Sequence, residues 1–153
     1  MHMKALTVQE IVEYAIKIEQ ESFTFYQSAA ETIIDERALK IIHVLADEEM
    51  THINRLRELL HMPKTTSLEM VKVATVEGIH FINMIPTNPI SKSASRQEIL
   101  REALAREKKT RDLYKRMVEM ATMSPPVQDT FQALEEQEQQ HVIRVEALIG
   151  ETE

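Results

Sequence analysis

Four stretches of this chain carry apolar residues at alternating spacings of three and four positions. That spacing keeps side chains on one face of an α-helix. The pattern therefore predicts four long helices, each about 37 Å in length at the α-helical rise. Their expected ranges are 7–33, 36–61, 95–121 and 124–150.

Residues that break helices and form turns are scarce in the chain. It contains two glycines and five prolines, and aromatic residues make up only 5%. A β-sandwich or barrel of this length needs many more turn residues, so we expect an all-α protein. With 153 residues, 43% of them hydrophobic, the chain can bury one core, and we expect a single domain over residues 1–153.

The ends of the predicted helices carry recognisable signals. The first and third begin with the capping-box sequences Thr7-x-x-Glu10 and Ser95-x-x-Glu98. The second stops before Pro63, Pro125 suits the first turn of the fourth, and Gly150 suits its C-terminal cap. We expect the chain to enter the first helix directly from its N-terminal residues.

The connections between the helices differ in length. Short links near Asp35 and Ser124 make the first two and the last two helices antiparallel neighbours. A crossover over about 62–94 separates these hairpins, and within it we expect a short helix over 67–76. Two helical hairpins joined by one long crossover form the ferritin-like four-helix topology.

The two predicted hairpins are copies of one pattern. The first helix repeats in the third after 88 residues, and the second repeats in the fourth after 89. In the first helix the stripe is Val12, Ala15, Glu19, Ser22, Tyr26, Ala29 and Ile33, and in the third it is Leu100, Ala103, Glu107, Thr110, Tyr114, Met117 and Ala121. In the second helix it is Ile42, Leu45, Glu49, His52, Leu56 and Leu59, and in the fourth it is Phe131, Leu134, Glu138, His141, Val145 and Leu148. Packed about an approximate twofold axis, equivalent positions would lie at the same depth in the core.

Each apolar stripe contains a glutamate at the same level, and no stripe contains a Lys or Arg to pair with it. Burying an unpaired carboxylate in a core costs roughly several kcal/mol of stability, even after the structure relaxes. Two divalent cations would balance four carboxylates. The expected ligands are Glu19, Glu49, His52, Glu107, Glu138 and His141.

The spacing of these residues supports a two-metal site. Glu49-x-x-His52 and Glu138-x-x-His141 each place a carboxylate and an imidazole one helical turn apart. Two such motifs with single glutamates from two other helices make the di-iron or di-manganese pattern of helical bundles. Glu49 and Glu138 are the expected bridges, and the sequence leaves open which remaining Glu accompanies which His. We expect the hydroxyls of Tyr26 and Tyr114 to approach ligand carboxylates.

These stretches resemble the rubrerythrin-like branch of the ferritin-like superfamily over nearly the whole chain except the crossover. The matching segments are Ala15-Ile16-Lys17-Ile18-Glu19 with Phe25-Tyr26, Leu45-Ala46-Asp47-Glu48-Glu49-Met50-Thr51-His52, Ala103-Leu104-Ala105-Arg106-Glu107 with Tyr114, and Leu134-Glu135-Glu136-Gln137-Glu138-Gln139-Gln140-His141. The resemblance implies a di-iron centre that reacts with hydrogen peroxide or dioxygen, with the family's ligand roles on the six residues named above.

The chain departs from the rubrerythrin pattern in two ways. It has no cysteine-rich rubredoxin domain, so the resemblance implies a separate electron-donor protein. It also has Thr110 where the family places an additional carboxylate, one turn after the third-helix ligand. By analogy with such bundles, we expect a homodimer.

Charge and composition exclude several classes of function. The net charge of −7 argues against a nucleic-acid partner, and the absence of Cys excludes disulfides, thiolate metal sites and thiol catalysis. No apolar run approaches the ~20 residues that span a bilayer, and no signal-peptide core begins the chain. We expect a cytoplasmic protein without a membrane partner.

Several functions remain open on this scaffold. The leading hypothesis is a di-iron oxidase or peroxidase. Iron storage or metal buffering would need a closed cage of subunits. Dimanganese catalase-like activity has the same ligand types. An interaction module that has lost its metal is the fourth alternative.

Overall fold

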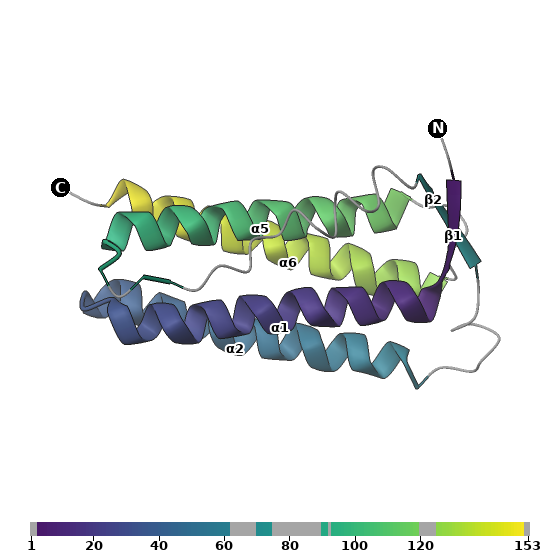
Figure 1. Ribbon diagram of the computed structural model, residues 1–153, viewed down its shortest axis with the longest axis horizontal. Coiled ribbons are helices and arrows are strands. Elements are labelled where there is room, and N and C mark those ends of the chain that lie inside the picture. The colour runs from purple at the N-terminus through teal and green to yellow at the C-terminus, as the bar shows by residue number, and fades with distance from the viewer. Residues whose placement is uncertain (1–2, 62–69, 75–89, 92, 120–124, 152–153) are drawn as a thin grey trace.

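The computed structural model describes residues 3–61, 70–74, 90–91, 93–119 and 125–151. Four helices dominate it: α1 (Val8–Thr32), α2 (Glu36–Leu59), α5 (Arg96–Glu119) and α6 (Pro125–Gly150). Figure 1 shows them side by side as a bundle, with the α1–α2 hairpin packed against the α5–α6 hairpin. The predicted all-α, ferritin-like four-helix bundle is confirmed. None of the described helices has the length and apolarity needed to cross a membrane.

The expected helix starts are confirmed by their caps. Thr7 caps α1: its side chain accepts from the backbone N–H of Glu10, and the Glu10 side chain accepts from the backbone N–H of Thr7. Ser95 and Glu98 make the same reciprocal pair at the start of α5. Asp35 caps α2 through the backbone N–H of Arg37. Each cap satisfies N–H groups that have no partner within the helix.

A small antiparallel sheet at one end of the bundle was not expected. Strand β1 (Met3–Thr7) pairs with β2 (Met70–Ala74), with Met3 opposite Ala74 and Thr7 opposite Met70. The chain therefore enters α1 from a strand, and the prediction of a helix over 67–76 is wrong for residues 70–74. The two valines of β2 favour extended backbone, and its partner strand lies far away in the sequence, beyond the reach of a local pattern. The rest of that predicted helix lies outside the described residues.

The core of the bundle consists of two apolar layers. One layer lies toward the start of α1 and contains Val12, Leu56, Tyr114 and Phe131 among others. The other lies toward the end of α1 and contains residues such as Ala29, Ile42, Leu100 and Leu148. Every described residue of the four stripes is buried; Ala121 lies outside the described residues. The interval between these two layers is where the polar stripe residues meet.

Candidate metal centre

Six polar side chains fill the middle of the bundle between the two apolar layers. Each is at most 2% exposed to solvent. All four helices contribute to this group, called here the central cluster. Its members are Glu19 from α1, Glu49 and His52 from α2, Glu107 from α5, and Glu138 and His141 from α6. The structure thus brings together all six residues that the sequence analysis selected.

One half of the central cluster is arranged around His52. Its Nδ1 lies 3.0 Å from Oε1 of Glu138 and 3.3 Å from Oε2 of Glu19. The distance from the same nitrogen to Oε1 of Glu49 is 3.4 Å. Three carboxylates from three helices therefore converge on the nitrogen of His52 that faces the bundle interior.

The other half is arranged in the same way around His141. Its Nδ1 lies 3.2 Å from Oε1 of Glu49 and 3.2 Å from Oε2 of Glu107. Oε2 of Glu138 is 3.5 Å away. The two imidazole rings are nearly parallel, at an interplanar angle of 14° with centroids 5.4 Å apart. The repeat seen in the sequence thus becomes an approximate symmetry of the cluster.

The two halves share two carboxylates. Ligand atoms within each half lie within 4.8 Å of one another, close enough for one metal ion per half. One set is Glu19, Glu49, His52 and Glu138, and the other is Glu49, Glu107, Glu138 and His141. Glu49 and Glu138 belong to both, which is the position of a bridging ligand. The arrangement places Glu19 with His52 and Glu107 with His141, the pairing that the sequence left open.

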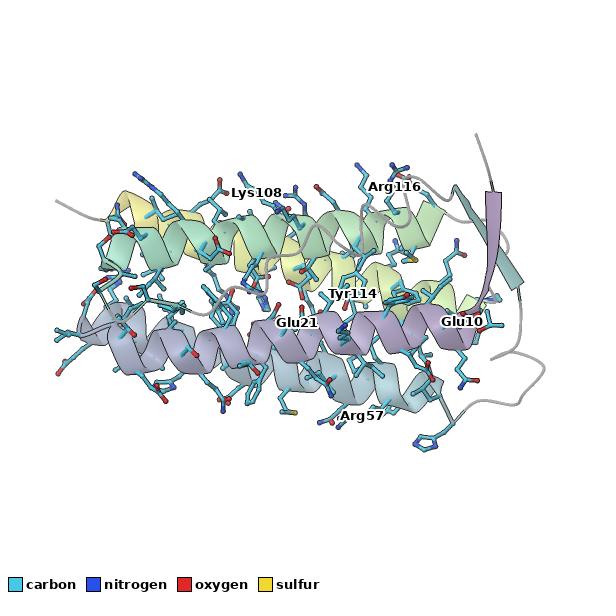
Figure 2. The ribbon with its side chains drawn as sticks, in the orientation of Figure 1. Glu10, Glu21, Arg57, Lys108, Tyr114 and Arg116 are labelled. Atoms are coloured by element: carbon cyan, nitrogen blue, oxygen red, sulfur yellow. The ribbon has the colours of Figure 1, made fainter. Side chains whose placement is uncertain are left out.

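Two buried tyrosines hold the carboxylates that are not shared. The hydroxyl of Tyr114 donates to Oε1 of Glu19 at 2.6 Å, and that of Tyr26 donates to Oε1 of Glu107. Figure 2 shows Tyr114 between α5 and α1, whereas Lys108 on the same helix points away from the bundle. Each tyrosine thus reaches across to the glutamate of the opposite hairpin. Burial raises the pKa of both phenols well above 10, and the adjacent carboxylates raise it further, so both remain hydrogen-bond donors.

The shared carboxylates favour the protonated state when no metal is bound. Burial raises the pKa of Glu49 and of Glu138 well above the usual 4.5. The negative charges of Glu19 and Glu107 raise both pKa values further. A carboxylate that is out of water and beside like charges binds a proton unless a cation replaces it.

The other members of the cluster favour their charged forms. Burial acts to raise the pKa of Glu19 and Glu107, but hydrogen bonds to these carboxylates and nearby histidine charge outweigh it, so both pKa values are lowered. Burial acts to lower the pKa of His52 and His141, but the surrounding carboxylates outweigh it, so both are raised. Without metal, protons therefore occupy the place of cations in this cluster.

The hydrogen bonding of the cluster fits a metal site. Both oxygens of Glu49 and both oxygens of Glu138 are buried and form no well-oriented hydrogen bond. The ring nitrogens that lie 3.0–3.5 Å from three of these oxygens belong to His52 and His141, which are themselves candidate ligands. Buried polar atoms almost always have a partner, and a missing partner calls for an explanation such as an ion. These four oxygens belong to the two shared carboxylates. A cation in each half would satisfy them and neutralise the charge of the four glutamates.

The sequence analysis missed two features around the cluster. Glu48 lies 2.5 Å from Nε2 of His141, and Arg144 donates to Glu48. Arg106 is only 3% exposed and places its guanidinium over the ring of Phe25, 4.6 Å from the centroid. Both Glu48 and Arg106 precede a predicted ligand by one residue, a position that the stripe pattern assigns to the neighbouring face. The hydroxyl of Thr110 donates to the backbone carbonyl of Arg106 on its own helix at 2.9 Å.

Comparison with known proteins identifies the fold. The sequence matches no protein-family model and no curated protein at a significant level. Its structure is similar to the crystal structure of a protein from Thermotoga maritima described as a candidate ferritin-like diiron-carboxylate protein, with a TM-score of 0.76. The two sequences are 21% identical, and the match covers 98% of this chain and 99% of the other. The chain therefore has the ferritin-like four-helix fold, with a buried Glu/His cluster that could bind metal.

Proposed function

We propose that this chain is a di-iron carboxylate oxidoreductase, similar to rubrerythrin, that is oxidised by hydrogen peroxide or dioxygen. The observation that carries the proposal is the pair of shared carboxylates, Glu49 and Glu138, whose four oxygens are buried without a well-oriented hydrogen bond. Support also comes from the similar Thermotoga maritima structure, whose description names a diiron-carboxylate protein. A di-iron site would use each of these oxygens.

The six residues of the central cluster would hold two ions in this proposal. Glu19 and His52 would bind one ion and Glu107 and His141 the other, with the two shared carboxylates between them. Two ferrous ions held there would supply two electrons together, enough to reduce one hydrogen peroxide, with two protons from solvent, to two molecules of water without releasing a radical. The mixed carboxylate and imidazole donors suit iron and also manganese. Dimanganese catalase-like activity is therefore the second candidate.

The surrounding residues supply geometry and exclude water. The hydroxyls of Tyr26 and Tyr114 fix the orientation of Glu107 and Glu19, and both phenols remain protonated. The apolar layers on either side keep bulk water away from the carboxylates. Because the cluster is at most 2% exposed, a small uncharged oxidant suits it better than a bulky substrate. Electrons for repeated turnover would come from a separate donor protein.

Anaerobic loading with Fe(II) tests the proposal. We expect two ions per chain, followed by fast growth of ferric absorbance when hydrogen peroxide or air-saturated buffer is added. Glu49→Ala is expected to bind fewer ions and to oxidise them no faster than buffer does. Oxidation by the wild-type chain that is no faster than in buffer would contradict the proposal. Manganese in protein purified without chelators, with oxygen release from peroxide, would favour the second candidate.

A further inference from the structure

The two histidines of the central cluster differ on the side that faces away from the carboxylates. Nδ1 of His141 faces the cluster, at 3.2 Å from both Glu49 and Glu107. Its other nitrogen, Nε2, lies 2.5 Å from Oε2 of Glu48. When Nδ1 binds a cation, the remaining ring proton would sit on Nε2 and be donated to Glu48, leaving the lone pair of Nδ1 directed at the cation. This contact fixes both the tautomer and the orientation of the ring.

Glu48 is itself held in place across the bundle. Nη1 of Arg144 donates to both of its carboxylate oxygens, at 3.0 and 3.1 Å. Arg144 follows His141 by three residues on α6, whereas Glu48 precedes Glu49 on α2. The resulting chain of contacts runs from α6 to α2 and back to α6. A carboxylate that is anchored in this way does not need to reorganise in order to accept from His141.

The internal repeat carries this arrangement on one side only. Moving back 89 residues takes His141 to His52 and Arg144 to Arg55, so the ligand and the arginine both have counterparts. The residue 89 positions after Glu48, however, is Gln137, so the carboxylate has no counterpart. Within the described ranges, the structure shows no carboxylate on Nε2 of His52. The repeat therefore preserves the six cluster residues and breaks at the residue behind the histidine.

We propose that Glu48 makes the two halves of the centre unequal, so that the half containing His141 and Glu107 binds a divalent cation more tightly than the half containing His52 and Glu19. The inference rests on the proposed function, because it requires that both halves bind metal. A carboxylate behind a ligating imidazole orients the ring and raises its basicity, and loss of such a partner typically lowers metal affinity by about 10–100-fold. The neutral amide of Gln137 offers no such charge. Glu48 is thus a positioning residue that acts through His141.

Titration with Co(II) against a competing chelator tests the inference. The wild-type chain is expected to bind two ions in two steps of different affinity. Glu48→Gln is expected to weaken the tighter step about tenfold and to leave the weaker step unchanged. Asp47→Asn is the matched control, because it removes the same charge from the neighbouring exposed residue. It is expected to change both steps little and equally.

A spectroscopic readout separates an effect on His141 from a general loss of structure. In the proton NMR spectrum of the chain with one equivalent of Co(II), we expect one dominant, slowly exchanging imidazole N–H signal shifted by the metal. Glu48→Gln is expected to move this signal and speed its exchange with water, while Asp47→Asn leaves it in place. Gln137→Glu, which places a carboxylate at the position that the repeat makes equivalent to Glu48, is expected to strengthen the weaker step.

The outcomes distinguish the inference from the proposed function. Two equal steps in the wild-type chain, equal weakening by Glu48→Gln and Asp47→Asn, or no effect of Gln137→Glu would each overturn the inequality while two ions still bind. A wild-type chain that binds no Co(II) and no Fe(II) would overturn the proposed function itself.

Discussion

Glu138 lies at the centre of the molecule, fully buried, and neither of its carboxylate oxygens forms a well-oriented hydrogen bond. Burial and the charges of its neighbours raise its pKa, so the metal-free fold holds it at a free-energy cost. We therefore expect Glu138→Ala to have opposite effects on the two forms. The metal-free chain should melt at a higher temperature than wild type, whereas the metal-dependent rise in melting temperature should largely disappear because metal binding is linked to folding.

Calorimetry with and without Mn(II), together with metal analysis of the dialysed protein, measures both effects. Glu136→Ala is the control, because Glu136 is an exposed carboxylate on the same helix. It should alter neither the metal content nor the metal-dependent shift. Full metal content in Glu138→Ala would remove Glu138 from the ligand set.

The hydroxyl of Tyr26 links the two hairpins. It donates to Glu107, which is buried and ionised in the metal-free cluster. Tyr26→Phe leaves that carboxylate oxygen without its donor, and an unsatisfied buried acceptor costs about 1–3 kcal/mol. We expect a lower urea midpoint at unchanged m-value for the metal-free chain. Tyr14→Phe, at a residue that is 39% exposed, should leave the midpoint unchanged; an equal loss in both variants would show that the Glu107 contact contributes nothing.

The six residues of the cluster could be predicted from the sequence because they interrupt an apolar pattern that is otherwise regular. A glutamate among buried positions is conspicuous whatever the details of packing. Glu48 gave no such signal, since it lies beside the stripe and its contact with His141 depends on how α2 and α6 pack. Arg106 likewise lies beside the stripe, and its burial depends on the ring of Phe25 from another helix. Residues that act across an interface need coordinates to be recognised.

Among the helices, α5 begins with a reciprocal capping pair. Ser95 provides that start by accepting from the backbone N–H of Glu98 at 3.1 Å. Ser95→Ala is expected to lower the free energy of unfolding by about 1 kcal/mol, the usual cost of losing an N-cap. Urea unfolding measures it. Ser28→Ala, the same substitution in the interior of α1, is expected to cost less, because Ala favours the helix there. Equal losses would show that the cap is not what stabilises this end.

The helices could be placed from the sequence to within about two residues because their periodicity and caps are local properties. The strand β2 could not, since Met70–Ala74 is held by pairing with Met3–Thr7. Such pairing joins segments separated by α1, α2 and the start of the crossover. A five-residue segment with two valines has too little periodicity to decide between helix and strand without knowledge of its partner. The short helix expected there was an inference from local pattern alone.

The whole molecule is built as two apolar layers with a polar cluster between them, and this layering ties its stability to pH. In the metal-free form, Glu49 and Glu138 hold protons more tightly in the folded chain than in the unfolded chain, where the pKa is near 4.5. The stability they contribute is present below that pH and is lost as pH rises through their folded pKa values. The raised pKa values of His52 and His141 likewise make the folded chain less stable as pH rises above 6.5. The lowered pKa values of Glu19 and Glu107 have the opposite effect: they make the folded chain less stable only as pH falls below 4.5.

Metal reverses this dependence, because a cation binds only after the protons have left its ligands. We expect the free energy of unfolding of the metal-free chain to fall as pH rises above 4.5, and to fall more steeply once pH also exceeds 6.5. With Mn(II) in excess, the stabilisation over the metal-free chain should grow over the same range of pH. Urea unfolding at several pH values, with and without Mn(II), measures both curves, and adding a strong chelator should return the second curve to the first. Two curves that run parallel would mean that protons and metal do not compete for these carboxylates, so the cations would lie elsewhere in the molecule.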